Sequence, residues 1–299
     1  MAKIARGLTL AEILPRAQQA GYAVPAFSTR YRACIRPAGE AAVETRSPVI
    51  IEISQRELGW FALTPRAFRD ELERVVADTN ADVPFALHLD HTTDLGVVRS
   101  AIDAGFTSVM IDASAKPFAE NVRVTREVVE LAHAAGVSVE AELGKLTDTH
   151  KIETDSDEEM YTDPAEAGEF VRATQCDALA VSIGTAHGNY PVKSPTIDFE
   201  RLDAIRRAVG PVPIVLHGGS GLPPETVARA IQAPGGGVSK MNIATDLEDA
   251  LRAAMGGTPR MTSAELDAQP PELVAKGLAA VKRVAKEKIT DFVRSAGRA

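Results

Sequence analysis

Short apolar segments alternate with longer amphipathic segments along the whole chain. Eight segments rich in β-branched residues have the length of a strand: residues 24–27, 49–54, 85–91, 108–114, 138–144, 178–184, 213–219 and 238–244. Several of them, such as the run that contains Ile50, Ile51 and Ile53, are too continuously apolar for a strand with one face in water. Strands buried on both faces belong to parallel sheets, so the pattern predicts a parallel sheet.

Helices are predicted between these strands, where apolar residues recur at spacings of three and four. The predicted helices span residues 37–45, 64–79, 95–104, 119–135, 163–174, 198–208, 223–232 and 244–255. Two of them begin with a capping residue before a proline, at residues 64–65 and 163–164, which is a typical helix start. Eight strand–helix units predict an α/β fold of the (β/α)8 TIM-barrel type. A doubly wound open sheet is the alternative, but it needs a glycine-rich loop after the first strand, where residues 28–30 contain no glycine.

Two segments interrupt this alternation. Residues 147–162 form a polar, acidic stretch after the fifth strand, and residues 256–271 are rich in glycine, proline and polar residues. A final helix is predicted over residues 272–294. We therefore expect a single domain over residues 1–299, with a C-terminal helical appendage that begins at about residue 256.

Composition narrows the possible partners. The 299-residue chain is 45% hydrophobic and 25% charged, which excludes wholesale disorder. Its net charge of −8 and its lack of basic runs argue against nucleic acid or an anionic membrane as a partner. The two cysteines, Cys34 and Cys176, are too few for a disulfide framework or a thiolate zinc site. Since the sequence has no run of ~18 apolar residues and its N-terminus lacks the apolar core of a signal peptide, we expect a cytoplasmic protein.

Three of the six histidines stand at the carboxyl ends of predicted strands, where the active sites of such barrels lie. These are His91, His187 and His217. Any one of them alone would read as a polar residue of the barrel rim. Three imidazoles beside carboxylates instead predict a zinc site with one position open to substrate. His88, three residues before His91, should face the other side of its strand, and His133 should face solvent on a helix.

Glycines mark a second candidate site. Gly218, Gly219 and Ser220 follow the seventh strand, and residues 242–246 follow the eighth. Loops after these two strands commonly bind phosphate in this fold, because glycine lets backbone N–H groups approach an anion at a helix N-terminus. A tight strand-to-helix turn would also demand glycine. The location and the serine favour a phosphate site.

At these residues the sequence resembles the class II, zinc-dependent ketose-bisphosphate aldolases, the family of fructose-bisphosphate and tagatose-bisphosphate aldolases. The matching stretches are LHLDH (87–91), GFTSVMID (105–112), VEAELG (139–144), residues 161–187, VLHGGSGL (215–222), KMNIATDL (240–247) and the C-terminus, residues 288–299. The resemblance spans nearly the whole chain. It implies a lyase that cleaves a ketose phosphate, reversibly, to dihydroxyacetone phosphate and an aldehyde.

The resemblance also implies roles for individual residues. His91, His187 and His217 would hold Zn²⁺, and Asp90 would be the acid/base that acts on the hydroxyl at the cleaved carbon. The dihydroxyacetone phosphate half would contact Gly188, Gly218, Gly219, Ser220, Asn242 and Thr245, and Ser54 would lie near the other phosphate of the substrate. Asp112 and Glu142 would lie in the outer shell or hold a second divalent metal or a monovalent cation. The family is oligomeric, so a homodimer or homotetramer is expected, with Arg294 and Arg298 as candidates to reach a neighbouring site.

The loop after the fifth strand departs from the family pattern. The family carries two glycines and a catalytic Glu there, whereas this chain has neither glycine and places His150 at the Glu position. Imidazole titrates near neutrality, so His150 can replace the Glu as acid/base. Glu153, Glu158 or Glu159 could also reach in, and a merely solvated His150 is the alternative.

The strands that form the far end of the substrate pocket depart as well. The first strand leads into Ser28, Thr29, Arg30 and Tyr31 in place of an Asn-rich segment, and Arg56 follows the second strand. Arginine suits forked binding of carboxylate, phosphate or sulfonate, so Arg30 and Arg56 are candidate substrate contacts. We expect a divergent member whose substrate is altered at the end away from the zinc.

Two other functions remain open from the sequence. One is a metal-binding aldolase-like barrel that performs different carbon–carbon or proton-transfer chemistry, because the loop Glu is missing. The other is an inactive sugar-phosphate sensor. A hydrolase of the amidohydrolase type is disfavoured, because residues 28–30 lack the HxH pair that it would carry after the first strand.

Overall fold

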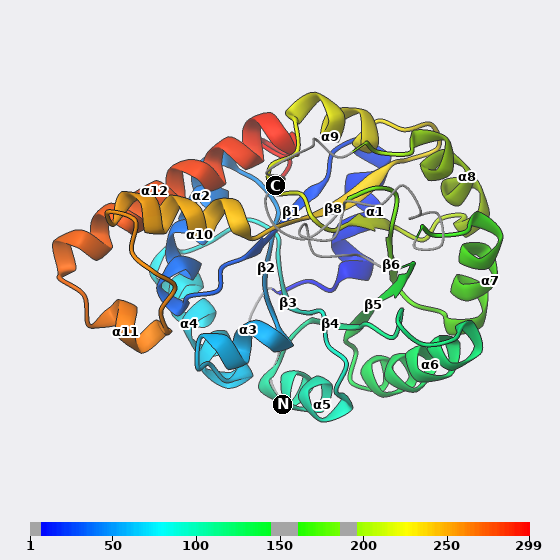
Figure 1. The fold of residues 1–299 in the computed structure, drawn as a ribbon, viewed down its shortest axis with the longest axis horizontal. Coiled ribbons are helices and arrows are strands. Elements are labelled where there is room, and N and C mark those ends of the chain that lie inside the picture. Colours follow the sequence, from blue (N-terminus) through cyan, green and yellow to red (C-terminus); the bar gives the residue numbers. More distant parts are fainter. Residues whose placement is uncertain (1–6, 145–160, 186–195) are drawn as a thin grey trace.

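Eight parallel strands close into a barrel in the computed structural model, which describes residues 7–144, 161–185 and 196–299. The strands are β1 (Val24–Ser28), β2 (Val49–Ser54), β3 (Phe85–Asp90), β4 (Ser108–Ile111), β5 (Ser138–Leu143), β6 (Ala178–Val181), β7 (Ile214–Leu216) and β8 (Val238–Ile243). Each strand pairs with the next, and β1 pairs with β8 to complete the ring (Figure 1). The predicted (β/α)8 barrel is confirmed.

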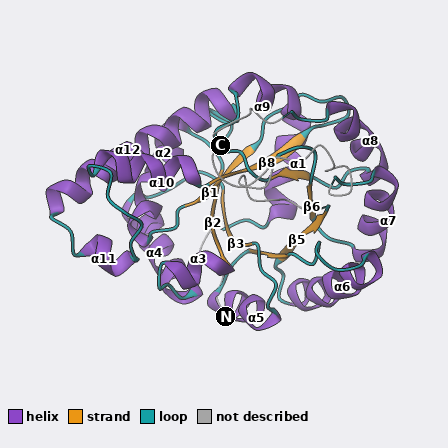
Figure 2. Ribbon diagram, in the orientation of Figure 1, coloured by secondary structure: helices purple, strands orange, loops and turns teal. Residues whose placement is uncertain are grey.

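Helices surround the barrel as its outer layer (Figure 2). They are α2 (Ile35–Thr45), α4 (Pro65–Asp78), α5 (Leu95–Ala104), α6 (Phe118–Ala134), α7 (Pro164–Thr174), α8 (Phe199–Val209), α9 (Pro224–Ile231) and α10 (Thr245–Ala254). The two predicted caps form: Thr64 Oγ1 accepts from the Ala67 N–H at 3.1 Å, and Asp163 Oδ1 accepts from the Ala165 N–H at 2.8 Å. Their prolines need no such partner because they lack an N–H.

Several strands end sooner at the mouth of the barrel than the apolar runs predicted. β3 ends at Asp90, and β6 and β7 end three residues before the predicted limits of 184 and 219. The backbone turns into the left-handed region at His91 (φ 33°), Gly184 (φ 110°) and Gly218 (φ 69°). A residue in that region cannot continue a ladder. These polar ends therefore bend away from the sheet and point residues across the mouth.

The helix α1 (Leu10–Ala20), which the strand–helix count did not predict, closes the amino-terminal end of the barrel. Its Leu10, Ile13, Leu14 and Ala17 are buried against inward-facing strand residues. Those strand residues are Val24, Ala26, Ile50, Ala86, Met110, Ala178, Ala180 and Val215. The barrel floor is therefore an apolar layer sealed by one helix.

Truncation of Leu14 to alanine should lower the free energy of unfolding by about 2–5 kcal/mol, because it removes buried methyl groups and leaves a cavity in this layer. Leu14 has no solvent exposure. The matched control is Gln19→Ala on the exposed face of the same helix, which should change stability by less than about 0.5 kcal/mol. Urea unfolding followed by circular dichroism measures both, and equal losses would contradict a sealing role for α1.

The C-terminal part packs on one side of the barrel, at the left in Figure 2. It comprises α11 (Ser263–Asp267), α12 (Pro271–Glu287) and a π-helical turn, Lys288–Phe292, in place of the single helix predicted over residues 272–294. α12 packs against α2 and α10, and Lys282 Nζ lies 3.0 Å from Glu40 Oε2 on α2. The described residues also include two short elements, α3 (Gln55–Trp60) and the 3₁₀ turn Arg32–Cys34.

The chain ends at the amino-terminal end of the barrel, opposite the mouth. The Ala23 N–H donates to the Val293 carbonyl (3.2 Å), and the Gly297 N–H donates to the Thr45 carbonyl (2.9 Å). The Arg298 guanidinium lies 5.6 Å from the Tyr22 ring centroid, and Arg294 lines a groove beside α8 and α9. Among the residues that the structure describes, none of the helices has the length and apolarity of a membrane span.

Candidate functional site

The half of the barrel interior nearest the mouth is lined by buried polar side chains. They are Glu52 on β2, His88 and Asp90 on β3, Glu140 and Glu142 on β5, and Lys240 and Asn242 on β8. Residues two apart in a strand face the same side, so the two members of each pair share the interior face. These charged side chains form a layer inside the barrel, between the mouth and the apolar layer that packs against α1. We call it the charged layer.

Lys240 is the cation of this layer. Its Nζ lies 2.8 Å from Glu140 Oε2, 3.2 Å from Glu52 Oε2 and 3.8 Å from Asp90 Oδ1. Burial lowers the pKa of Lys240, but the three carboxylates outweigh burial and raise that pKa above its ordinary value. Lys240 therefore stays charged and compensates the acidic groups around it.

The three carboxylates respond differently to their shared cation. Burial favours the neutral form of all three. For Glu140, Lys240 and His217 outweigh burial and lower the pKa to about 2, and for Asp90 the charges of His91 and Lys240 hold the pKa well below its usual range. For Glu52, burial and the Asp90 charge raise the pKa to about 8. At neutral pH, Asp90 and Glu140 are thus ionised, whereas the surroundings of Glu52 favour its neutral form.

His217 follows β7 and is oriented by Glu140. Its Nε2 donates to Glu140 Oε1 at 2.8 Å, and its Nδ1 lies 3.4 Å from Glu142 Oε2. Because the ionised Glu140 can only accept, it fixes the ring proton on Nε2. Burial lowers the pKa of His217, but its hydrogen bonds with Glu140 and Glu142 outweigh burial and raise that pKa to about 10, so Nδ1 must lose its proton before it can bind a metal. A carboxylate behind an imidazole is the usual support of a metal-ligating histidine.

His91 lies directly beside His217, with their ring centroids 4.4 Å apart. The left-handed turn at the end of β3 swings this ring out of the ladder and across the mouth. Its Nδ1 lies 3.4 Å from Asp112 Oδ2 and 3.7 Å from Glu142 Oε2. Burial raises the pKa of Asp112, but its hydrogen bond with His91 outweighs burial and helps to lower the pKa to about 2.

These donors fit a zinc ion. One ligand atom each from Asp90, His91 and His217 lie within 4.8 Å of one another, as do atoms of His91, Asp112 and Glu142. Imidazole with carboxylate is a donor set that zinc prefers. A third group, Glu52 with His88 and Asp90, is equally compact, but the Lys240 ammonium already compensates its carboxylates. The two histidine groups are therefore the candidate metal centre, and the predicted third ligand, His187, lies outside the described residues.

The loops after β7 and β8 lock together through close backbone contacts. The Gly219 N–H donates to the Asn242 carbonyl at 3.1 Å, and a Cβ at Gly219 would lie 2.6 Å from that oxygen, so only glycine fits. Ser220 Oγ accepts from the Ala244 and Asp246 N–H groups, each at 3.3 Å, at the start of α10. Gly218, Ser220 and Thr245 are thereby gathered at one helix N-terminus, as the phosphate prediction requires.

Asn242 links the loops after β7 and β8 to the charged layer. Its Nδ2 donates to Asp90 Oδ1 at 3.1 Å, and it is nearly buried. The carboxylate of Asp90 is therefore held between the Asn242 amide and the Lys240 ammonium. The residue that the resemblance assigns as acid/base is fixed in direction and charge.

The rim residues lie at or just after the ends of two strands: Arg30 follows β1, Ser54 ends β2, and Arg56 follows β2. Ser54 caps α3, and Arg30 lies between Glu57 and Glu248, with its Nε 2.8 Å from Glu57 Oε1. The exposed Arg56 stacks over Trp60, with its guanidinium carbon 4.6 Å from the ring centroid.

Three predicted site residues, His150, His187 and Gly188, lie outside the described residues, as do Glu153, Glu158 and Glu159. Of the other histidines, His88 bonds with Ser108 inside the barrel (Nδ1 to Oγ, 2.9 Å), and His133 pairs with Asp177 on the outside (2.8 Å).

The sequence reasoning did not single out Lys240, Glu57 or Glu248. The signal for Lys240 was a lone lysine inside a buried strand, two residues before Asn242. A charged residue at such a position needs an internal partner.

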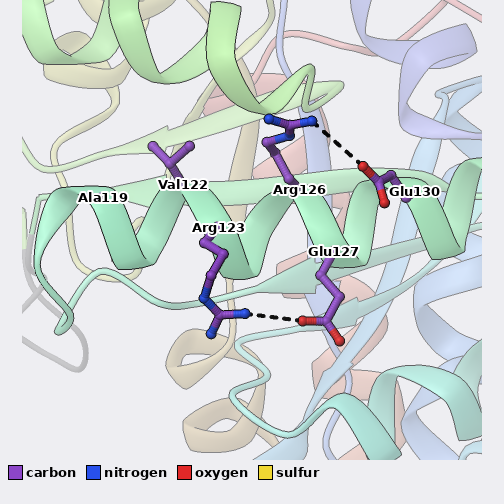
Figure 3. Close-up of a pocket in the computed structure, with 6 residues that line it drawn as sticks. All are labelled: Ala119, Val122, Arg123, Arg126, Glu127 and Glu130. Carbon is purple, nitrogen blue, oxygen red and sulfur yellow. Dashed lines mark hydrogen bonds and ion pairs between the residues drawn. The ribbon is translucent and has the colours of Figure 1, made fainter.

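A groove on the outer face of α6 lies away from this centre. It is lined by Ala119, Val122, Arg123, Arg126, Glu127 and Glu130 (Figure 3). Its charged residues pair along the helix, Arg123 with Glu127 at 3.5 Å and Arg126 with Glu130 at 3.8 Å. Such pairs are typical of a solvated helix face, and we assign the groove no function.

Fold and site together define a (β/α)8 barrel with a candidate metal centre at the carboxyl ends of its strands. The family model described as class II fructose-bisphosphate aldolase matches residues 8–298, so the chain belongs to that family. Its members are aldolases, and an aldolase is a lyase.

Solved structures agree with this assignment. The YdjI aldolase from Escherichia coli K12 is 34% identical, with a TM-score of 0.82 over 98% of this chain and 99% of that one. A putative fructose-1,6-bisphosphate aldolase from Coccidioides immitis is 31% identical, with a TM-score of 0.76 over 96% of each chain. A fructose-bisphosphate aldolase from Campylobacter jejuni, at 22% identity and a TM-score of 0.76 over 97% of each chain, shares the fold.

Replacement of Lys240 by methionine should destabilise the barrel by about 3–5 kcal/mol, because it leaves buried carboxylates without their cation. The control is Lys282→Met, which removes a partly exposed ion pair with Glu40 and should cost less than about 1 kcal/mol. Urea unfolding compares the two variants, and a Lys240→Met loss no greater than the control would show that Lys240 does not hold this layer.

Proposed function

We propose that this protein is a zinc-dependent aldolase that cleaves a ketose phosphate or bisphosphate, reversibly, to dihydroxyacetone phosphate and an aldehyde. The observation that carries the proposal is the His91–His217 pair, 4.4 Å between ring centroids, beside a buried and ionised Asp90. Family membership supplies the reaction class. The donor set and the glycine loops supply the reason to expect a metal and a phosphate.

In this proposal His91, His187 and His217 hold the zinc. When bound, the ion supplies a Lewis acid that offsets the negative charge developing as the carbon–carbon bond breaks. Glu140 keeps His217 in the tautomer that can bind it. Asp112 and Glu142, within reach of His91, take outer positions or hold a second divalent metal or a monovalent cation.

Asp90 is proposed as the base for the first proton transfer. Its carboxylate accepts the proton of the hydroxyl on the carbon that becomes the aldehyde, and returns it in the condensation direction. Lys240 and Asn242 hold that carboxylate ionised and aimed at the mouth. A second acid/base must exchange a proton with the carbon of the dihydroxyacetone phosphate half, and we assign it to His150, with Glu153, Glu158 and Glu159 as alternatives.

The phosphate of that half is proposed to bind at the β7 and β8 loops. Gly218, Ser220 and Thr245 supply backbone N–H groups and hydroxyls near the start of α10, and Asn242 supplies an amide. Gly219 allows the two loops to approach closely, and Gly188 completes the pocket. The Ser220 hydroxyl, although it accepts two backbone N–H groups, still has its own proton to donate to an anion.

The far end of the substrate is proposed to differ from that of fructose 1,6-bisphosphate, with Ser54, Arg30 and Arg56 as its contacts. We further propose that the protein is a homodimer or homotetramer. We also propose a cytoplasmic location, with which two buried free cysteines, Cys34 and Cys176, are consistent. A screen of ketose 1-phosphates and bisphosphates, including sugars with terminal acid groups, identifies the substrate. Better cleavage of fructose 1,6-bisphosphate than of every other sugar would refute the altered far end.

Two alternatives follow from the departure at His150. The barrel could bind zinc yet perform different carbon–carbon or proton-transfer chemistry, or it could be an inactive sugar-phosphate sensor. Metal analysis combined with a coupled assay for dihydroxyacetone phosphate separates these cases. Bound zinc without release of dihydroxyacetone phosphate from any ketose phosphate would favour them over the aldolase.

The variant His217→Ala should lose zinc and activity together, because the metal would keep only two of its three imidazoles. Metal content by mass spectrometry and turnover in the coupled assay are the measurements. The control His133→Ala removes a histidine on the outer face of α6 and should keep both. A fully metallated and active His217→Ala variant would refute the site.

The variant Asp90→Ala should keep its zinc and lose turnover by about 10²–10⁴-fold, the usual contribution of a positioned acid/base. The imidazole ligands remain in place, so metal content separates this variant from His217→Ala. Wild-type rates in the coupled assay would remove Asp90 from the mechanism.

A further inference from the structure

A buried glutamate fills the place beside Ser54 where the family resemblance puts the second phosphate of the substrate. Glu57 Oε2 accepts from the Ser54 N–H at 3.0 Å and from the Ser28 hydroxyl at 2.6 Å, and its Oε1 accepts from Arg30 Nε at 2.8 Å. Ser54 Oγ in turn accepts from the Glu57 N–H at 3.2 Å. The donors that a phosphate would use here already serve a carboxylate of the chain itself.

This carboxylate lies at the mouth of the barrel and next to the reacting groups. Ser54 pairs with Asp90 across the β2–β3 ladder, and Ser28 pairs with Glu52 across the β1–β2 ladder. The Glu57 side chain is only 7% exposed. A second phosphate at Ser54 would therefore meet a poorly screened negative charge at contact distance.

The charges around Glu57 are already balanced. Arg30 bonds both Glu57 and Glu248, and Arg260 forms a forked pair with Glu248, with both N–O distances 2.7 Å. The two arginines and two glutamates sum to zero. A phosphate that recruited Arg30 would leave a buried carboxylate without its cation, which is a costly arrangement.

The start of α10 is built differently. It follows β8, which only β1 separates from β2 in the barrel. The N-terminus of α10 is filled by the Ser220 hydroxyl, which is neutral and can donate to an anion. Glu57 at α3 is an acceptor only and carries a charge. The start of α10 thus keeps a place for phosphate, and the start of α3 closes it.

We propose that Glu57 excludes a second phosphate, so that the substrate is a ketose 1-phosphate whose far end carries hydroxyl groups and no phosphate. The proposal rests on the proposed function and deepens it, because it names the substrate class. It assigns Glu57 as a specificity-determining residue. Besides any contact with the hydroxyl groups of the substrate, Arg30 then serves as partner to Glu57 and Glu248, and Ser54 serves as helix cap.

The test compares kcat/KM for fructose 1-phosphate with that for fructose 1,6-bisphosphate, and the same pair for tagatose, in the zinc-loaded protein. The wild type should prefer the monophosphates. Glu57→Gln should raise the bisphosphate-to-monophosphate ratio about tenfold or more, because it removes a like charge while its amide oxygen can still accept from Arg30 or Ser54. Glu57→Asp keeps the charge and should keep the wild-type preference.

The matched control is Glu12→Gln, which removes the carboxylate of the same capping motif on α1 at the closed end of the barrel. It should leave the ratio unchanged. An equal or better wild-type rate with the bisphosphates overturns the inference without any variant, as does an unchanged ratio in a folded Glu57→Gln protein.

A failure of the proposed function would look different, with no ketose phosphate cleaved by the wild type. In that case calorimetry measures the affinity of the wild type and of Glu57→Gln for fructose 1-phosphate and for fructose 1,6-bisphosphate. Tighter bisphosphate binding by Glu57→Gln than by the wild type supports the exclusion, and equal binding overturns it.

Discussion

The ammonium of Lys240 is the interaction on which the rest of this centre depends. It stands between Glu140, Glu52 and Asp90 inside the barrel, where an uncompensated carboxylate would be far costlier than at the surface. Through Glu140 it maintains the acceptor that fixes the tautomer of His217. Through Asp90 it maintains an ionised carboxylate beside the metal centre. One cation therefore sets the state of both a candidate ligand and the candidate base.

That arrangement needs an apolar layer beneath it, and α1 provides part of that layer. Its apolar face packs against the strand residues at the floor of the barrel. Low local polarity strengthens every attraction within the layer and also raises the cost of any unpaired member. The charged layer consequently depends on the apolar floor, which strengthens the attractions between its members.

The sequence predicted the barrel because each strand is marked by continuous burial and each helix by its spacing and caps. It also predicted that His91 and His217 would converge, because both residues follow strands whose carboxyl ends lie at the same rim of the barrel. It missed α1, because a helix outside the strand–helix repeat leaves no trace in the count. It missed the roles of Lys240 and Glu57, because their partners come from distant segments: Lys240 is 100 residues from Glu140, and Glu57 is 29 residues from Ser28. Such pairings depend on how the strands lie beside and across from one another in the barrel, which local patterns do not encode.

Two helices that begin at the mouth of the barrel, α10 and α3, are capped in different ways. A helix N-terminus at the rim exposes N–H groups that must be satisfied by the chain or by a ligand. At α10 the chain uses the Ser220 hydroxyl, whereas at α3 it uses the Ser54 hydroxyl together with the Glu57 carboxylate, which accepts from the Ser54 N–H. The first choice leaves a donor for an anion, whereas the second commits a negative charge and binds Arg30 to it. Under the proposed function, the capping residues at these two helix starts would therefore decide which end of a sugar phosphate carries the phosphate group.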